Sequence, residues 1–112
     1  MLYKDLKIGD KELKLRLSTR DCVALEKRLG RNPLDDLMAV EQGKLPTITY
    51  VVILLHASLQ KYQSNYSMEN VYDLYDEYIE EGNSLTDMLA VITDIFKVSG
   101  FFKEPDKETP EI

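Results

Sequence analysis

The sequence predicts an α+β fold that is mostly helical, with an N-terminal β-hairpin packed on a bundle of about five helices. Residues 2–17 alternate apolar and polar side chains, which is the period of a β-strand with one buried face. From residue 18 onward, apolar side chains recur at helical spacing between residues that favour helix ends. A chain of 112 residues is long enough for one domain with its own core, which we expect to span residues 2–102.

The hairpin is expected from two alternating segments joined by a short turn. Gly9 and Asp10 separate the segments, and a glycine there accepts the positive φ that two-residue turns require. A hairpin alone is marginal in water, so its apolar face is expected to rest on the helices. That face comprises Leu2, Leu6, Ile8, Leu13, Leu15 and Leu17.

Residues 45–62 are expected to form the central helix. Residues 50–57 are apolar except for His56, which is more apolar surface than a helix with one buried face carries. Because residues 50–55 are rich in β-branched side chains, a buried strand is the alternative interpretation. A helix is favoured because the pattern continues at spacings of three and four residues, and neighbours are expected on two sides of it. The stripe consists of Ile48, Val51, Val52, Leu55, Leu59 and Tyr62.

Small polar residues and glycines divide the rest of the chain into the other helices. A serine or asparagine side chain caps free N–H groups where a helix starts, and glycine accepts the left-handed conformation where it ends. Residues 103–112 contain two prolines and many charges, so we expect a disordered charged tail there. The expected starts are Ser18, Asn32, Ser67 and Ser84, and the expected ends are Gly30, Gly43, Gly82 and Gly100.

The chain is acidic, with 14 basic and 20 acidic residues and a net charge of -6, which disfavours a phosphate-binding surface. We therefore expect no nucleic-acid partner. Because no leader segment and no membrane-length apolar run is present, we expect a cytoplasmic protein without membrane contact. The excess acid lies in residues 67–81, which hold no base. A solvated helix face is the simplest interpretation, and a basic partner is the alternative because like charges one turn apart destabilise a helix.

The residues that usually build catalytic and metal sites are scarce. His56 is the single histidine and Cys22 the single cysteine, too few for a Cys/His metal site or a nucleophile pair with a spare member. We expect both to be packed side chains. Each glycine stands alone at the end of an element, so no phosphate-binding loop is expected. The sequence favours a protein that is not an enzyme and uses no cofactor or metal.

Four segments together give the chain a resemblance to a known family. They are LKLRLSTRDCVALEKRLGRNPLDDLM at residues 13–38, LLHASLQKY at 54–62, VYDLYDEYIEEG at 71–82 and FKVSGFF at 96–102. In their order and spacing the chain resembles the tail assembly chaperones of long-tailed, siphovirus-type bacteriophages and prophages of Gram-positive bacteria. The resemblance covers nearly the whole chain and includes no catalytic signature.

The resemblance implies a protein that binds the tape measure protein, a very long apolar helical polypeptide, and keeps it soluble until tail tube subunits polymerise round it. It implies action in the cytoplasm of the bacterial host and absence from the mature virion. Genes of this kind commonly yield a longer frameshifted product whose extension recruits the tail tube protein, which is a second implied partner. Self-association through the client-binding surface is a further expectation.

The binding surface is predicted on physical grounds, because the family supplies no invariant binding side chains. The last two expected helices carry more apolar positions than one buried stripe each requires, and tyrosines cluster before and within the first of them. We therefore predict an exposed apolar surface on which Tyr75, Tyr78, Phe101 and Phe102 anchor the client. The alternative is an acidic protein-binding module or inhibitor that acts on a basic host protein, whose complex should weaken steeply in salt.

Overall fold

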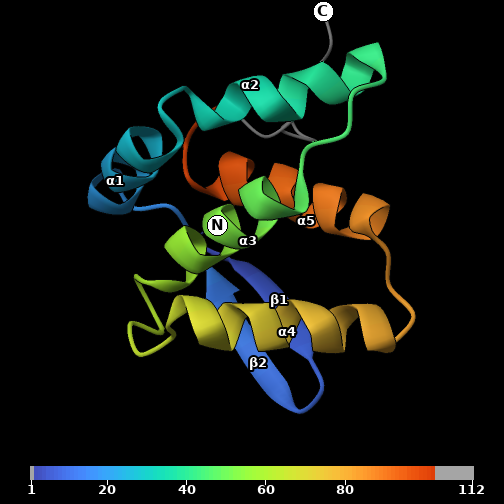
Figure 1. Ribbon diagram of the computed structural model, residues 1–112. Helices are drawn as coiled ribbons and strands as arrows, with labels where there is room; N and C mark the ends of the chain where they lie inside the picture. The colour runs from blue at the N-terminus through green and yellow to red at the C-terminus, as the bar shows by residue number, and fades with distance from the viewer. Residues whose placement is uncertain (1, 103–112) are drawn as a thin grey trace, which may run out of the picture.

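The computed structural model describes residues 2–102 and places a β-hairpin against a set of helices (Figure 1). The predicted fold class, α+β and mostly helical, is confirmed. The predicted disordered tail, residues 103–112, lies outside the described residues. The elements in chain order are β1 (Lys4–Ile8), β2 (Lys11–Leu15), α1 (Thr19–Leu29), α2 (Pro33–Met38), the 3₁₀ helix η1 (Ala39–Gln42), α3 (Ile48–Leu59), α4 (Met68–Glu80) and α5 (Leu85–Val98).

The hairpin forms at the predicted turn, where Gly9 has a φ of 63°. β1 and β2 pair antiparallel with Leu6 opposite Leu13, so the apolar side chains share one face, at whose two ends lie Lys4 and Lys11. One expectation is corrected: Leu2 is 67% exposed rather than part of the apolar face. It precedes β1, which begins at Lys4, and therefore has no strand residue opposite it.

Hydrogen bonds fix the end of the hairpin to two helices. The N–H of Arg16 donates to the carbonyl of Ser58 in α3 at 2.9 Å, and its guanidinium Nη1 donates to the carbonyl of Val98 in α5 at 2.6 Å. The N–H of Leu17 donates to Ser99 Oγ at 2.9 Å. Since these partners lie far away in the sequence, the bonds hold the apolar face of the hairpin on the helices.

α3 is the central helix, as predicted. Thr47 caps it, since its Oγ1 accepts the N–H of Tyr50 at 3.0 Å. α1 and α4 both pack against it, which confirms that it is covered on more than one side. Ile48 and Tyr62 belonged to the predicted stripe but are exposed, because they lie at the first residue of α3 and beyond its end. The buried residues of α3 are Tyr50, Val51, Val52, Leu54, Leu55, Ser58 and Leu59.

Reciprocal caps set where the last two helices begin. Ser67 Oγ accepts the N–H of Asn70 at 3.1 Å, while Asn70 Oδ1 accepts the N–H of Ser67 at 3.0 Å. Ser84 and Asp87 repeat this arrangement at α5, at 3.2 and 2.9 Å. α4 packs on α3 and β1, whereas α5 packs on β1 and α2. In Figure 1, α2 and α4 therefore lie on opposite sides of α3 and α5.

Candidate functional site

An apolar groove of about 530 Å³ lies between the α2–η1 segment and α5, and we call it the α2–α5 groove. Its volume is within the range of about 300–1,000 Å³ that is typical of binding pockets. Met38 and Phe102, at its edge, are 51% and 36% exposed. The groove is lined by Leu37, Met38, Val40, Glu41, Leu89, Ala90, Thr93 and Phe102.

The local sequence explains why this side of the molecule stays open. Asn32 caps α2 with its Oδ1 on the N–H of Leu34 at 2.9 Å, and Pro33 occupies the first turn. The Tyr50 hydroxyl donates to the carbonyl of Pro33 at 2.5 Å, which fixes the start of α2 on α3. After Met38 the chain tightens into η1, whose side chains follow a shorter period than those of an α-helix. The start of α2 is therefore held on α3, whereas η1, at the other end of the segment, does not continue this packing.

The chemistry of the groove is that of an apolar receptor. Methionine is flexible and adapts to apolar partners of varied shape. Ala90 is small and exposed, and the Thr93 hydroxyl is already used, since it donates to the carbonyl of Leu89 at 2.9 Å. Glu41 is exposed and forms no ion pair within residues 2–102. The groove can therefore accept apolar side chains and, at one point, a cation.

The four predicted anchors are not brought together. Phe102 lines the α2–α5 groove, as an exposed anchor should. Phe101 is half-buried against Phe96, with ring centroids 4.7 Å apart, and lines a different hollow beside Cys22. The prediction that Tyr75 and Tyr78 stand on an exposed surface is wrong, because they are 7% and 4% exposed.

The physical reason is the rotation of α4. Its apolar residues cover so wide an arc that two stripes at helical spacing fit the sequence, one through Tyr72 and Ile79 and the other through Leu74 and Tyr78. The structure turns Tyr72 and Ile79 outward, to 46% and 39% exposure, and turns Leu74 inward with the two buried tyrosines. Burial raises the pKa of both Tyr75 and Tyr78, as expected for hydroxyls removed from water.

Sequence reasoning missed Met38, Leu37 and Ala90 as site residues. A signal was present: α2 has only 6 residues, yet the segment through η1 carries four large aliphatic or methionine side chains. A helix that short buries few of them. The partner side of the groove on α5 could not have been found in this way, because it depends on how two distant segments pack. The four side chains are Leu34, Leu37, Met38 and Val40.

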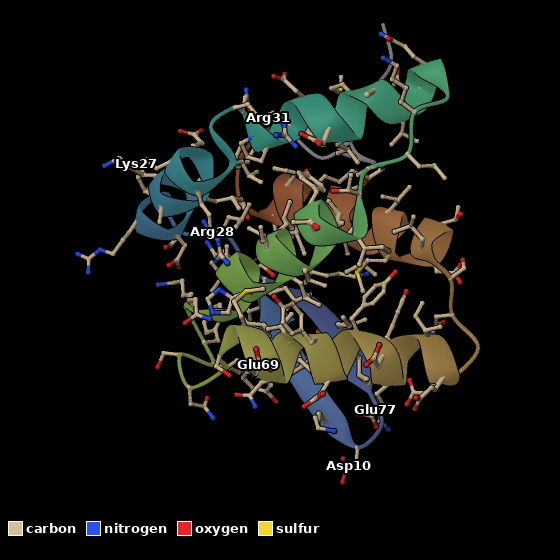
Figure 2. The ribbon with its side chains drawn as sticks, in the orientation of Figure 1. Asp10, Lys27, Arg28, Arg31, Glu69 and Glu77 are labelled. Atoms are coloured by element: carbon tan, nitrogen blue, oxygen red, sulfur yellow. The ribbon has the colours of Figure 1, made fainter. Side chains whose placement is uncertain are left out.

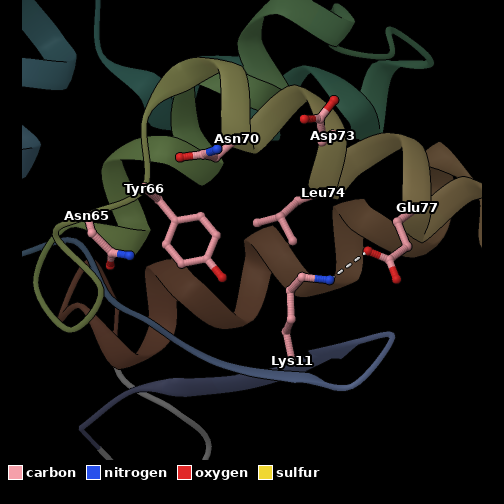
Figure 3. A pocket seen from close by; sticks show the side chains of 7 residues that line it. All are labelled: Lys11, Asn65, Tyr66, Asn70, Asp73, Leu74 and Glu77. Atoms are coloured by element: carbon pink, nitrogen blue, oxygen red, sulfur yellow. Dashed lines mark hydrogen bonds and ion pairs between the residues drawn. The ribbon is translucent and has the colours of Figure 1, made fainter.

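A second, polar pocket of about 360 Å³ lies between β2, α4 and the segment before it (Figure 3). Lys11 Nζ and Glu77 Oε1 form an ion pair there at 2.9 Å, and this hydrogen bond is the main cause of the raised pKa of Lys11. Nearby, the N–H of Gly9 donates to Glu81 Oε2 at 2.5 Å. The hairpin therefore compensates part of the acidic face of α4, for which a solvated face was the simplest interpretation. The pocket is lined by Lys11, Asn65, Tyr66, Asn70, Asp73, Leu74 and Glu77.

The basic residues and the α4 glutamates that Figure 2 labels lie in different parts of the molecule. Figure 2 shows Lys27, Arg28 and Arg31 around the end of α1 and the start of α2, whereas Glu69 and Glu77 project from α4. Neither charged region borders the α2–α5 groove closely enough to supply a lining residue. The groove and the acidic face are therefore separate surfaces.

His56 and Cys22 are half-buried in separate hollows. Burial, and then the positive charge of Arg28, lowers the pKa of His56, while burial raises the pKa of Cys22. Within residues 2–102, no three His, Cys, Asp or Glu side chains are placed to hold a metal ion. Every helix of this part of the chain is too short or too polar to cross a membrane.

Comparison with known proteins gives one family. No curated protein and no solved structure matches the chain. A family model described as a family of unknown function (DUF6096) matches residues 2–111, which is nearly the whole sequence. The chain therefore belongs to the DUF6096 family.

Proposed function

We propose that this chain is a bacteriophage or prophage tail assembly chaperone that binds apolar helical segments of the tape measure protein in the α2–α5 groove. It would keep that client soluble in the cytoplasm of the bacterial host and be absent from the mature virion. The observation that carries the proposal is the open apolar groove with Met38 and Phe102 at its edge. The resemblance of residues 13–102 to such chaperones supplies the identity of the client.

A helix is the form of client that suits this groove. Both of its sides are helical. Leu89 and Thr93 stand one turn apart on α5. On the other side, Met38 and Glu41 stand one 3₁₀ turn apart. An amphipathic helix binds such a groove by laying its apolar face between the two rows of side chains. Ala90 between them leaves room for close approach, because its side chain is a single methyl group.

The rest of the surface has a supporting role in this proposal. The acidic residues of α4 lie on the other side of α3 and α5 from α2, where they remain in water when the groove is filled (Figure 1). A net charge of -6 helps to keep a loaded complex soluble. The proposed role is binding without catalysis, and the tail tube protein is a second partner recruited by a longer frameshifted product.

The direct test is co-expression with a tape measure protein from the same phage or prophage, followed by measurement of the soluble fraction of that client. The wild type should raise the soluble fraction. Met38→Ser/Phe102→Ser should lose most of the gain, because it removes the two exposed apolar side chains of the groove. Tyr72→Ser/Ile79→Ser is the matched control, since it removes two side chains of similar exposure from α4.

The outcomes separate function from site. No gain from the wild type contradicts the chaperone function. A gain retained by the groove variant but lost by the α4 variant moves the binding site to α4. Both variants must first show the circular dichroism spectrum of the wild type. A complex that forms at low salt but dissociates at about 1 M salt, where the screening length is about 3 Å, favours the acidic binding module instead.

A further inference from the structure

The α2–α5 groove contains one charged side chain among its described lining residues, and that charge suggests which client segments enter. Resting on the proposed function, we propose that the groove selects amphipathic helices that carry a lysine or arginine beside their apolar face, and that Glu41 recognises this cation. The chaperone function alone does not specify which apolar helical segments of the client are bound.

Glu41 is placed to bind a cation at the edge of the groove. It lies one 3₁₀ turn after Met38, so its carboxylate borders the apolar lining. The side chain is exposed and, within residues 2–102, no basic group lies within ion-pair distance of it. On α5, Leu89 and Ala90 carry no charge, and the Thr93 hydroxyl already donates to the carbonyl of Leu89. None of these three side chains can therefore pair with the carboxylate of Glu41, and a client cation would supply a partner.

Charge also argues against the chain's own end as the occupant. Residues 103–112 follow directly after Phe102, which lines the groove, so they are close enough in sequence to be considered. They contain two lysines against four acidic residues, a composition that opposes a groove whose charge is negative. A second copy of the chain is disfavoured in the same way, because each copy carries a net charge of -6. A separate basic, amphipathic helix has the complementary charge.

The expected size of the effect follows from exposure. An ion pair at a solvent-exposed edge contributes little, so the cation should improve binding by about two- to fivefold at low salt. The apolar side chains would supply most of the affinity, and the cation would decide between segments that are otherwise equally apolar. The preference should shrink as salt is raised, because exposed charges are screened.

The test uses two synthetic amphipathic helices that differ at one position flanking the apolar face, where one has lysine and the other glutamate. Fluorescence anisotropy gives the Kd of each for the full-length chain. The wild type should prefer the lysine peptide, Glu41→Gln should show little preference, and Glu41→Lys should prefer the glutamate peptide. Glu80→Lys is the matched control, because it makes the same change in charge at the end of α4 and should keep the wild-type preference.

Each other outcome contradicts the inference. The wild type could bind both peptides with equal affinity, or Glu41→Lys could leave the preference unchanged. Either result would show that Glu41 does not bind the cation of the peptide. A chain shortened to residues 1–102 that binds both peptides much more tightly would identify residues 103–112 as the occupant. Binding that weakens as protein concentration rises would identify a second copy.

Failure of this inference and failure of the proposed function are distinguishable. If the wild type solubilises the tape measure protein but neither peptide shows a Glu41-dependent preference, the chaperone function stands and the selectivity is wrong. If the preference reverses with Glu41→Lys but the tape measure protein gains no solubility, the groove selects basic helices for a different purpose.

Discussion

α4 and the α2–η1 segment lie on opposite sides of α3 and α5, and they use apolar side chains in opposite ways (Figure 1). α4 carries three tyrosines and the α2–η1 segment has no aromatic residue, yet α4 turns Tyr75 and Tyr78 into the core. The shorter α2 leaves Met38 51% exposed at the edge of a groove. The apolar content of a segment therefore does not predict its exposure, which is set by the surface against which the segment packs.

The two regions differ in length and in neighbours. α4 has 13 residues, packs on α3 and β1, and is tied to the hairpin by the Lys11–Glu77 ion pair. α2 has 6 residues and then changes to a 3₁₀ turn, so it covers less of α5. A long helix held on two neighbours buries a wide apolar arc, whereas a short one leaves part of its own and of its partner's apolar surface in water.

The largest expected effect is the loss of a buried aromatic on the α4 side. Tyr78→Ala should lower the free energy of unfolding by roughly 3–5 kcal/mol, because it leaves a cavity in the core. Met38→Ala should cost less than about 1 kcal/mol, because half of that side chain is already in water. Urea titrations of both variants measure the contrast. Equal losses would mean that the two regions are packed alike.

The structural features that the sequence predicts correctly are those that depend on neighbouring residues. The Gly9 turn, the caps at Ser67 and Ser84 and the burial of α3 on more than one side each depend on residues close together in the chain, and each is confirmed. These local features were sufficient to predict the fold class.

Two features could not be predicted from the sequence, because they depend on tertiary packing. The rotation of α4 is not fixed by its pattern, since Tyr72 and Leu74 both fit an apolar stripe and only the positions of α3 and β1 decide between them. The groove depends on the distance between α2 and α5, which no short segment encodes. Of the predicted anchors, Phe102 therefore lies in the groove while Tyr75 and Tyr78 do not.

Loss of a helix cap should reduce stability by an intermediate amount in both regions. Ser67→Ala on α4 and Asn32→Ala on α2 each remove a capping hydrogen bond, and each should cost about 1 kcal/mol in urea titrations. Their effects on peptide binding should differ. Asn32→Ala should weaken binding because α2 forms one side of the groove, whereas Ser67→Ala should leave it unchanged. Weaker binding by both would show that α4 takes part in the site.

Filling the groove should change binding with still less change in stability. Ala90→Leu places a larger apolar side chain in the groove from α5, and its effect on unfolding should stay within about 0.5 kcal/mol because position 90 is exposed. Peptide affinity and client solubility should fall because the space is occupied. Thr86→Leu, an exposed position of α5 outside the groove lining, is the control and should bind as the wild type does. Unchanged binding by Ala90→Leu would mean that clients dock elsewhere.

The smallest expected effect concerns the hollow between α1 and α3, which lies outside both regions and contains His56 beside Arg28. The pKa of His56 is lowered from 6.5, first by burial and then by the positive charge of Arg28. The unfolded chain therefore binds this proton more readily than the folded one. The stability that the neutral His56 retains is fully present above about pH 6.5 and is lost as pH falls through the lower, folded pKa.

His56→Gln removes this titration while keeping a polar side chain of similar reach. The difference in free energy of unfolding between the wild type and His56→Gln should therefore be constant above about pH 6.5 and should shift against the wild type at lower pH. The comparison cancels the carboxylates, which titrate in both proteins. Arg28→Gln should reduce the shift, because it removes the second cause. A difference that does not change with pH would show that His56 is as free in water as an open groove residue, and would place this hollow with the α2–α5 groove rather than with the closed core under α4.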